Sequence, residues 1–206
     1  MIKLERTAVM NFDNAIRGMR NPLASWEKSD SYTAEDGHFV LGEADLKLAS
    51  SLARSGTDHR KYLRQIFVSV VITAPLYWWK EYDTYKVATV ANSTSTMHKI
   101  HARPFSREDF SHERMTPAAL ACLDNIIAVL EERRQVFVET KERAAWDDMI
   151  QLLPTSFHQM RTCTLNYENL IGIYYARREH KLPEWHELCR WIEALPYAAE
   201  LICNLK

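Results

Sequence analysis

The sequence predicts a single domain in which long helices pack around a small sheet. Its 206 residues are the length of one domain. Segment 64–73 alternates its side chains as a strand does and is rich in β-branched residues, whereas 117–137 carries apolar residues three to four positions apart, as a helix does. Hydrophobic residues make up 47% of the chain, which is enough for a buried core.

The first quarter of the chain predicts two helices and a long loop. Residues 2–10 are predicted to form a strand, and 11–19 a short helix that ends before Pro22. Residues 21–42 are rich in polar residues with little periodicity, so we expect a surface loop. Residues 44–55 place apolar residues on one face of a helix that Gly56 ends.

The middle of the chain predicts the clearest strand and a second long loop. After the strand at 64–73, Pro75 suits the first turn of a helix over 76–89. Residues 92–116 form a polar connection longer than a compact domain usually contains, which indicates a functional loop.

The last part of the chain is predicted to be helical. Thr116 is a suitable N-cap and Pro117 a favoured first residue for the helix that begins there. Further helices are expected over 146–153, 155–178 and 184–203.

Composition excludes several functional classes. With 26 Lys+Arg and 27 Asp+Glu the net charge is −1, so we expect no binding to a nucleic-acid polymer. Only 5 glycines are present, and neither GxGxxG nor the P-loop motif occurs. The 4 cysteines include no CxxC pair, and the start MIKLERTAVM has no apolar core of a signal peptide, so we expect a cytoplasmic protein with free thiols. The longest apolar stretch, 66–79, is too short to span a membrane.

Two regions are candidates for binding chemistry. The run 92–99 presents hydroxyl and amide side chains beside His98 and Lys99, which offer donors to phosphate or sugar oxygens, although an ordinary Ser/Thr-rich loop is an equal alternative. Arg177 ends an apolar and aromatic helical stripe, where a cation is costly unless it meets an anion or a carboxylate. The pair His98-x-x-His101 has no further ligand pattern, so no metal is predicted, and no GxSxG motif of a serine hydrolase occurs.

The order of these features resembles the flavin-dependent thymidylate synthases (the ThyX family). The strand that ends in Thr73-Ala74-Pro75, the helix after it and the polar run 92–99 follow the family order. Asn166 and Arg177 keep the family spacing of eleven residues. The resemblance implies an α+β fold with long helices on a small sheet, within one domain over 1–206. It also implies a homotetramer with sites between subunits, in which a flavin mediates methylene transfer from a folate to dUMP.

The chain departs from the family signature at the residues that hold the flavin and the nucleotide. Where the family has Arg-His-Arg, this chain has Thr84, Tyr85 and Lys86. The stretch that corresponds to Asn-Glu-x-Ser-x-Arg is 91–96 or, with a shift of one residue, 92–97, and neither alignment restores the glutamate or the arginine. A histidine of the family that contacts the flavin falls on Gln65. Losing three charge-assisted contacts of about 1.5–3 kcal/mol each would weaken FAD binding by several kcal/mol.

The sequence therefore predicts a nucleotide-binding, ThyX-like protein that is not a working thymidylate synthase. It would hold or sequester a nucleotide or a nucleotide-derived signal in clefts between subunits, and a viral protein that acts against host defence is one form of this role. The alternative is a flavin-dependent methyl- or hydroxymethyl-transferase that acts on a pyrimidine nucleotide such as dUMP, with FAD as cofactor. A third hypothesis is a structural oligomer that retains the surfaces through which the family assembles but has lost ligand binding.

The predicted site combines donors with aromatic rings. The donors are Lys86, Asn92, Ser93, Ser95, His98, Lys99, Asn166, Arg177 and Arg178. The rings predicted to stack on the ligand are Trp78, Trp79, Tyr82, Tyr85 and Tyr174. For Trp78 and Trp79 a place in the core is the competing interpretation.

Overall fold

A computed structural model describes residues 1–205 of the chain. These residues divide into two compact units. The first, here called the hairpin unit, comprises 1–3, 72–84 and 92–162, and the second, here called the bundle unit, comprises 4–71, 85–91 and the chain from 163 onward. The single domain predicted from the chain length stays a prediction.

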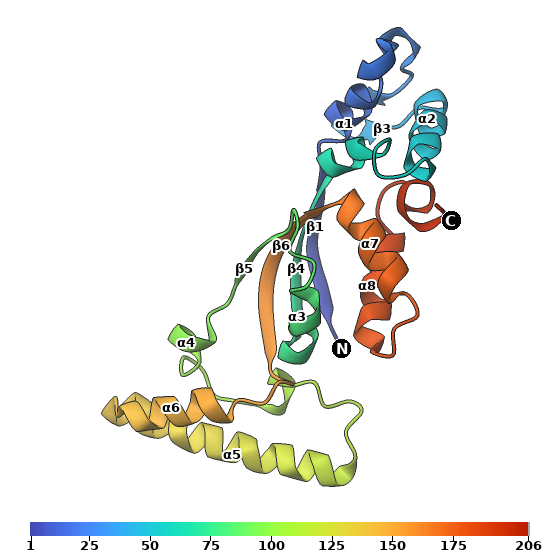
Figure 1. Cartoon of the computed structure of the whole chain (residues 1–206). Coiled ribbons are helices and arrows are strands. Elements are labelled where there is room, and N and C mark those ends of the chain that lie inside the picture. The colour runs from blue at the N-terminus through green and yellow to red at the C-terminus, as the bar shows by residue number, and fades with distance from the viewer. Residues whose placement is uncertain (206) are drawn as a thin grey trace. The chain divides into compact units, whose positions relative to one another are not determined.

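The sheet contains four strands in the order β1-β4-β6-β5 (Figure 1). Their bounds are β1 Lys3–Met10, β4 Phe67–Pro75, β5 Val90–Ser93 and β6 His158–Asn166. Burial alternates along β4, where Val68, Val70 and Ile72 have no exposed surface. This alternation is the period of two that predicted the strand.

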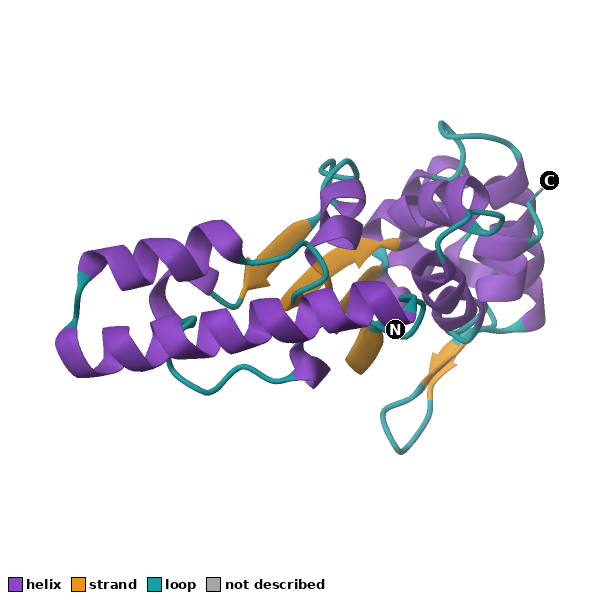
Figure 2. Ribbon diagram, turned by 90° about the horizontal axis from the view of Figure 1, so that it is seen from below, coloured by secondary structure: helices purple, strands orange, loops and turns teal. Residues whose placement is uncertain are grey.

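The hairpin unit is named after two helices, α5 (Pro117–Thr140) and α6 (Arg143–Leu152), that lie side by side (Figure 2). The Thr116 hydroxyl accepts a hydrogen bond from the backbone N–H of Ala119 and so caps α5, as predicted. Three short helices complete this unit: α3 (Leu76–Tyr82), α4 (Thr96–Lys99) and η4 (Arg107–Asp109).

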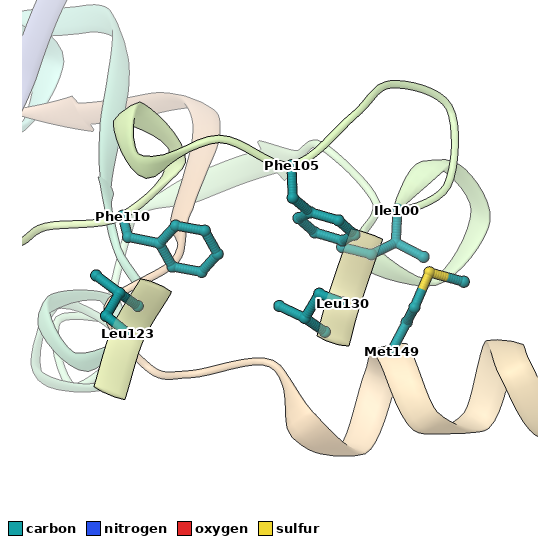
Figure 3. Packing of buried hydrophobic residues seen from close by; sticks show 6 residues of the cluster. All are labelled: Ile100, Phe105, Phe110, Leu123, Leu130 and Met149. Carbon is teal, nitrogen blue, oxygen red and sulfur yellow. The ribbon is translucent and has the colours of Figure 1, made fainter. Parts of the chain in front are cut away.

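A hydrophobic cluster joins the hairpin to the segment that follows α4. Figure 3 shows Ile100 and Phe105 of that segment beside Leu130 of α5 and Met149 of α6. Phe110 packs in the same cluster and is 1% exposed. The polar connection 92–116 is therefore anchored to the hairpin by three buried side chains.

Besides the parts of β1, β4, β5 and β6 that fall within its range, the bundle unit contains helices and one small hairpin of strands. Its helices are α1 (Phe12–Met19), η1 (Asn21–Leu23), η2 (Trp26–Lys28), α2 (Glu43–Arg54), η3 (Lys61–Gln65), α7 (Tyr167–Arg177), α8 (Pro183–Glu193) and the π-helical η5 (Ala199–Cys203). The strands β2 (Tyr32–Thr33) and β3 (Phe39–Val40) pair antiparallel. Leu63, Trp185 and Ile192 are fully buried in this unit.

The structure confirms the α+β class and most of the predicted elements. The strand at 2–10 and the helices at 11–19, 44–55 and 117–137 form within one or a few residues of the predicted bounds. Gly56 follows α2 with φ of 97°, the left-handed conformation that suits a helix stop. No helix in the described part of the chain is long and apolar enough to cross a membrane.

Five predicted segments differ from the structure. The helix predicted over 155–178 is wrong, because 158–166 forms β6 between β4 and β5 and only 167–177 is helical. The helix over 76–89 ends at Tyr82, and the strand over 64–73 begins only at Phe67. The predicted loops 21–42 and 92–116 contain short helices and, in the first, the β2–β3 hairpin.

Candidate functional site

A cavity of about 920 Å³ opens in the hairpin unit. This volume lies within the range of about 300–1,000 Å³ that is typical of small-molecule sites. Its hydrogen-bonding side chains come from Lys3, Thr73, Thr94, Ser95, Thr96, Lys99, Arg103, Glu108, Asp109, His112, Glu113 and His158. Its apolar surface comes mainly from Ile100, Phe105, Phe110, Phe157 and Met160. We call it the hairpin cavity.

One wall of the hairpin cavity is the turn that leads from β5 into α4. The backbone N–H of Thr94 donates to the carbonyl of Met160 at 2.8 Å, which fixes the turn to β6. The Ser95 hydroxyl caps α4 by accepting from the backbone N–H of His98 at 3.0 Å. These two hydrogen bonds hold in place the part of the wall that carries Thr94, Ser95 and Thr96.

The end of α4 and the segment after it supply two of the cations that line the cavity, Lys99 and Arg103. Lys99 is exposed at the end of α4, and Arg103 forms an ion pair with Asp109 that raises the pKa of the guanidinium further. Asp109 also closes a capping box with Ser106 at the start of η4. Asp109 thereby positions Arg103 at the cavity, where Lys99 supplies a further, exposed positive charge.

His158 and Glu113 are two further titratable residues that line the cavity. Burial lowers the pKa of His158, so its imidazole is neutral at neutral pH. Burial alone would raise the pKa of Glu113, but a hydrogen bond from the amino group of Met1 brings that pKa to about 2. Glu113 is thereby paired with the amino group of Met1, which lines the cavity together with Lys3.

The structure brings only part of the predicted site into this cavity. Ser95 and Lys99 line it, whereas His98, Asn92 and Ser93 are exposed and do not. Arg103 and His158 were missed, because each lies far along the chain from the run 92–99. Thr94 and Thr96, also missed, stand between the predicted residues of that run, so the hydroxyl pattern itself was a usable signal.

Other predicted residues lie in the bundle unit, where Arg177 has contacts of its own. Its Nε donates to the hydroxyl of Tyr85 at 2.7 Å, and its guanidinium carbon lies 4.5 Å from the ring centre of Trp185. Lys86, next to Tyr85, is exposed. Arg177 thus contacts the side chains of Tyr85 and Trp185, here called the aromatic box. These contacts stabilise the guanidinium within the chain, as an anionic ligand was expected to do.

Three further predicted residues of the bundle unit have structural contacts. The Asn166 side chain caps α7 by accepting from the backbone N–H of Asn169 at 2.9 Å. The Tyr174 hydroxyl donates to Glu193 at 2.8 Å. Arg178 is exposed, and its guanidinium carbon lies 5.1 Å from the ring centre of Tyr175.

The aromatic residues of α3 form a buried cluster in the hairpin unit. Trp78 and Tyr82 stack with ring centres 5.2 Å apart, and Trp79 meets both rings edge-on. Trp79 Nε1 donates to the carbonyl of Gln159 at 2.9 Å, and the Arg161 guanidinium covers its ring at 4.2 Å. These rings pack against one another and against Arg161. For Trp78 and Trp79 this corresponds to the interpretation that they belong to the core, which was the alternative to stacking on a ligand.

The residues at the family's flavin signature do not fit a flavin diphosphate. The Thr84 hydroxyl donates to the carbonyl of Glu81 at 2.7 Å, and the Tyr85 hydroxyl receives Arg177. At these three positions only Lys86 can offer a positive charge to a phosphate. A single ammonium is a poor replacement for the two arginines of the family signature, because it binds phosphate as a point charge and not with two parallel hydrogen bonds. No reaction step through a flavin is therefore derived for this chain.

Comparison with solved structures identifies the fold as that of the flavin-dependent thymidylate synthases, which confirms the resemblance at the level of the fold. Thymidylate synthase X from Helicobacter pylori with FAD and dUMP superposes with a TM-score of 0.75 at 17% identity, over 100% of this chain and 99% of that one. The UMP/dUMP methylase PolB from Streptomyces cacaoi bound with 5-Br dUMP has a TM-score of 0.66 at 13% identity, over 98% and 94% of the two chains. The same methylase bound with 5-Br UMP has a TM-score of 0.64 at 14% identity, over 100% and 95%. No family model matches the chain, and no curated protein matches its sequence.

Proposed function

We propose that the protein binds a pyrimidine nucleotide in the hairpin cavity and is not a working thymidylate synthase. The observation that carries this proposal is the position of the stretch Thr94-Ser95-Thr96 on the cavity wall. The resemblance aligns this stretch with the end of the family segment Asn-Glu-x-Ser-x-Arg. The structural neighbours are complexes with dUMP, 5-Br dUMP and 5-Br UMP, which supports a uridine-type ligand.

The lining of the hairpin cavity suits each part of a nucleotide. Phe105 and Phe157 offer apolar rings to the base, and the hydroxyls of the 94–96 turn hydrogen-bond to the sugar. Lys99 and Arg103 place positive charge for one phosphate. A monophosphate fits this set better than a triphosphate, because Asp109 already neutralises much of the charge of Arg103.

Retention of the ligand without turnover follows from the altered flavin signature. Thr84 and Tyr85 are engaged within the chain, so the redox cofactor of the family lacks its usual phosphate contacts. A protein that binds the nucleotide and cannot alter it lowers the free concentration of that nucleotide. Sequestration of a nucleotide signal in clefts between subunits, in the form of a viral protein against host defence, is the extension of this proposal.

Mass spectrometry of the denatured supernatant and calorimetry with UMP and dUMP test nucleotide binding. We expect an intact nucleotide to be released or, for the emptied protein, a dissociation constant in the micromolar range. Lys99→Ala should weaken binding about tenfold, the equivalent of about 1.4 kcal/mol, by removing one phosphate contact. Lys47→Ala, which changes an exposed lysine of α2, is the matched control. No nucleotide released and no shift of the melting temperature with either compound would refute the proposal.

The alternative is a flavin-dependent methyl- or hydroxymethyl-transferase acting on a nucleotide such as dUMP. The observation in its favour is the FAD in the Helicobacter pylori neighbour. A yellow protein with a flavin absorption spectrum would replace the sequestration proposal by this one. A colourless protein whose melting temperature ignores added FAD would exclude it. Absence of any bound nucleotide or flavin, with no shift of the melting temperature by UMP, dUMP or FAD, would instead favour the purely structural oligomer.

A further inference from the structure

A second cavity, of about 410 Å³, lies in the hairpin unit. It is lined by residues 111–115 and 154–156 together with Tyr77. Phe110 and Phe157 form an antiparallel bridge, and the backbone N–H of Ser111 donates to the carbonyl of Ser156 at 2.9 Å. Ser111 and Ser156 are therefore opposite each other on one face of the bridge, while the two phenylalanines belong to the other face.

Ser111 forms a hydrogen-bonded pair with a histidine. Its Oγ lies 2.8 Å from Nε2 of His158, which is the diagonal neighbour of Ser111 across the bridge. Burial lowers the pKa of the His158 ring overall, although the backbone carbonyl of Glu108 raises it. In the neutral tautomer that carries its proton on Nδ1, Nε2 is free to accept the proton of the Ser111 hydroxyl. This is the arrangement of a serine nucleophile with its general base.

The second serine supplies an independent observation. Ser156 is 8% exposed, and its Oγ has no hydrogen-bond partner among the described residues. A buried hydroxyl without a partner is costly, because it loses its hydrogen bonds to water. It lines the same cavity as Ser111. A ligand oxygen in the cavity would satisfy this hydroxyl.

We infer that Ser111 is an activated nucleophile, with His158 as its general base and the Ser156 hydroxyl as an oxyanion donor, for a small carboxylic ester held in the 410 Å³ cavity. This site differs from the proposed nucleotide site, because Ser111 and Ser156 do not line the hairpin cavity. Only His158 of these three residues borders that cavity.

The reaction balances with water as the second reactant. The Ser111 oxygen bonds to the carbonyl carbon while its proton passes to Nε2 of His158, and the Ser156 O–H donates to the carbonyl oxygen as it becomes negative. The bond from that carbon to the alkoxy oxygen then breaks, and the alcohol leaves with the proton from His158. Water attacks the acyl-serine in the same way and loses its proton to His158. Ser111 recovers the proton, and a carboxylic acid leaves.

Labelling with a fluorophosphonate reagent tests the nucleophile directly. Trypsin releases residues 108–114 as Glu-Asp-Phe-Ser-His-Glu-Arg, in which Ser111 is the only serine, so mass spectrometry locates the adduct without ambiguity. We expect a single adduct on this peptide, absent in Ser111→Ala. p-Nitrophenyl acetate should give a burst of one p-nitrophenol per chain. An adduct confined to other peptides, or none at all, would overturn the inference.

Variants separate the roles of the neighbours. His158→Gln should slow labelling about 100-fold, since general bases contribute about 10²–10⁴-fold. Ser156→Ala should slow it about tenfold or more through loss of the oxyanion donor. His59→Gln, which changes an exposed histidine of the bundle unit, is the control for both. An unchanged labelling rate in a folded His158→Gln variant would overturn the inference.

The pH dependence of the wild-type chain gives a test that needs no variant. The labelling rate should rise with pH and level off, with its midpoint below the ordinary histidine value of about 6.5, because burial lowers the pKa of His158. The amino group of Met1 also lowers this pKa, whereas Glu113, Asp109 and the Glu108 carbonyl raise it. A rate that climbs without a plateau up to pH 9 would show that His158 is not the base.

Discussion

Arg177 is a cation stabilised by aromatic rings within its own unit. It hydrogen-bonds to Tyr85 and stacks on Trp185 at 4.5 Å. Arg177→Ala should lower the free energy of unfolding by about 2 kcal/mol, because it removes a charge-assisted hydrogen bond and a cation–π contact. Tyr85→Phe should cost about 1 kcal/mol. Urea denaturation measures both, and Lys181→Ala, at an exposed position, should change the free energy by less than about 0.5 kcal/mol. Equal stability of Arg177→Ala and the wild type would show that the contacts of Arg177 with Tyr85 and Trp185 contribute nothing to the free energy of unfolding.

Single residues also show where prediction from sequence stops. The apolar stripe around Arg177 indicated a cation in need of an anion or a carboxylate, which stays a prediction, and it did not indicate the contact with Tyr85, 92 residues away in the sequence. Ser111 and His158 are 47 residues apart, and no GxSxG motif marks them. Such pairs depend on strand pairing and register, which a single sequence does not specify. Ser95, in contrast, was found because its neighbours in the cavity adjoin it along the chain.

Glu131 links two elements of the hairpin unit, α5 and the segment that follows α4. The Arg134 guanidinium, at 2.6 and 2.8 Å, lowers the pKa of the Glu131 carboxyl to about 2, and the backbone N–H of Phe105 donates to the same carboxyl at 3.1 Å. Because the folded pKa lies below the unfolded value of about 4.3, this stabilisation is complete above that value and is lost as the pH falls towards 2.

Replacement of this carboxylate should therefore loosen the wall of the hairpin cavity. Glu131→Gln should cost about 1–2 kcal/mol at pH 7 and nearly nothing at pH 2, measured by denaturation at both pH values. Glu132→Gln is the control, since that side chain is 63% exposed. If Glu131→Gln destabilises the protein equally at pH 7 and pH 2, the effect is one of shape and not of charge.

At the scale of elements, local pattern predicted helices and the β4 strand but not β6. Thr162 and Thr164 alternate with buried residues along β6, yet the surrounding apolar positions also match a helical period. Pairing with β4 and β5 decides the outcome, because it satisfies the backbone of a central strand. For a similar reason, the short helices and the β2–β3 hairpin within the loop 21–42 were not predicted. Their arrangement depends on buried Asp45 of α2, which accepts hydrogen bonds from Arg20, Ser29 and Ser31.

For the molecule as a whole, composition and resemblance predicted the fold correctly. The five glycines excluded glycine-rich phosphate loops, and the hairpin cavity presents side-chain cations, among them Lys3, Lys99 and Arg103. The four cations Lys86, His98, Lys99 and Arg177 were expected in one cleft. Two of them belong to each unit, so their convergence stays a prediction. Asn166 and Arg177, which keep the family spacing, lie at the two ends of α7: Asn166 is its N-cap, and Arg177, its last residue, contacts the rings of Tyr85 and Trp185.

Assembly into a homotetramer is the remaining prediction for the whole molecule, and the helical hairpin offers a surface for it. Val129 of α5 and Leu152 of α6 border one surface hollow and are 43% and 39% exposed. Light scattering should give four times the chain mass of 24.0 kDa. Val129→Glu combined with Leu152→Glu should yield smaller species, because burying two carboxylates at an interface is costly. Leu23→Glu, at a site 83% exposed in the bundle unit, should leave the mass unchanged. A wild-type mass of 24.0 kDa at micromolar concentration would contradict assembly and, with it, any site shared between subunits.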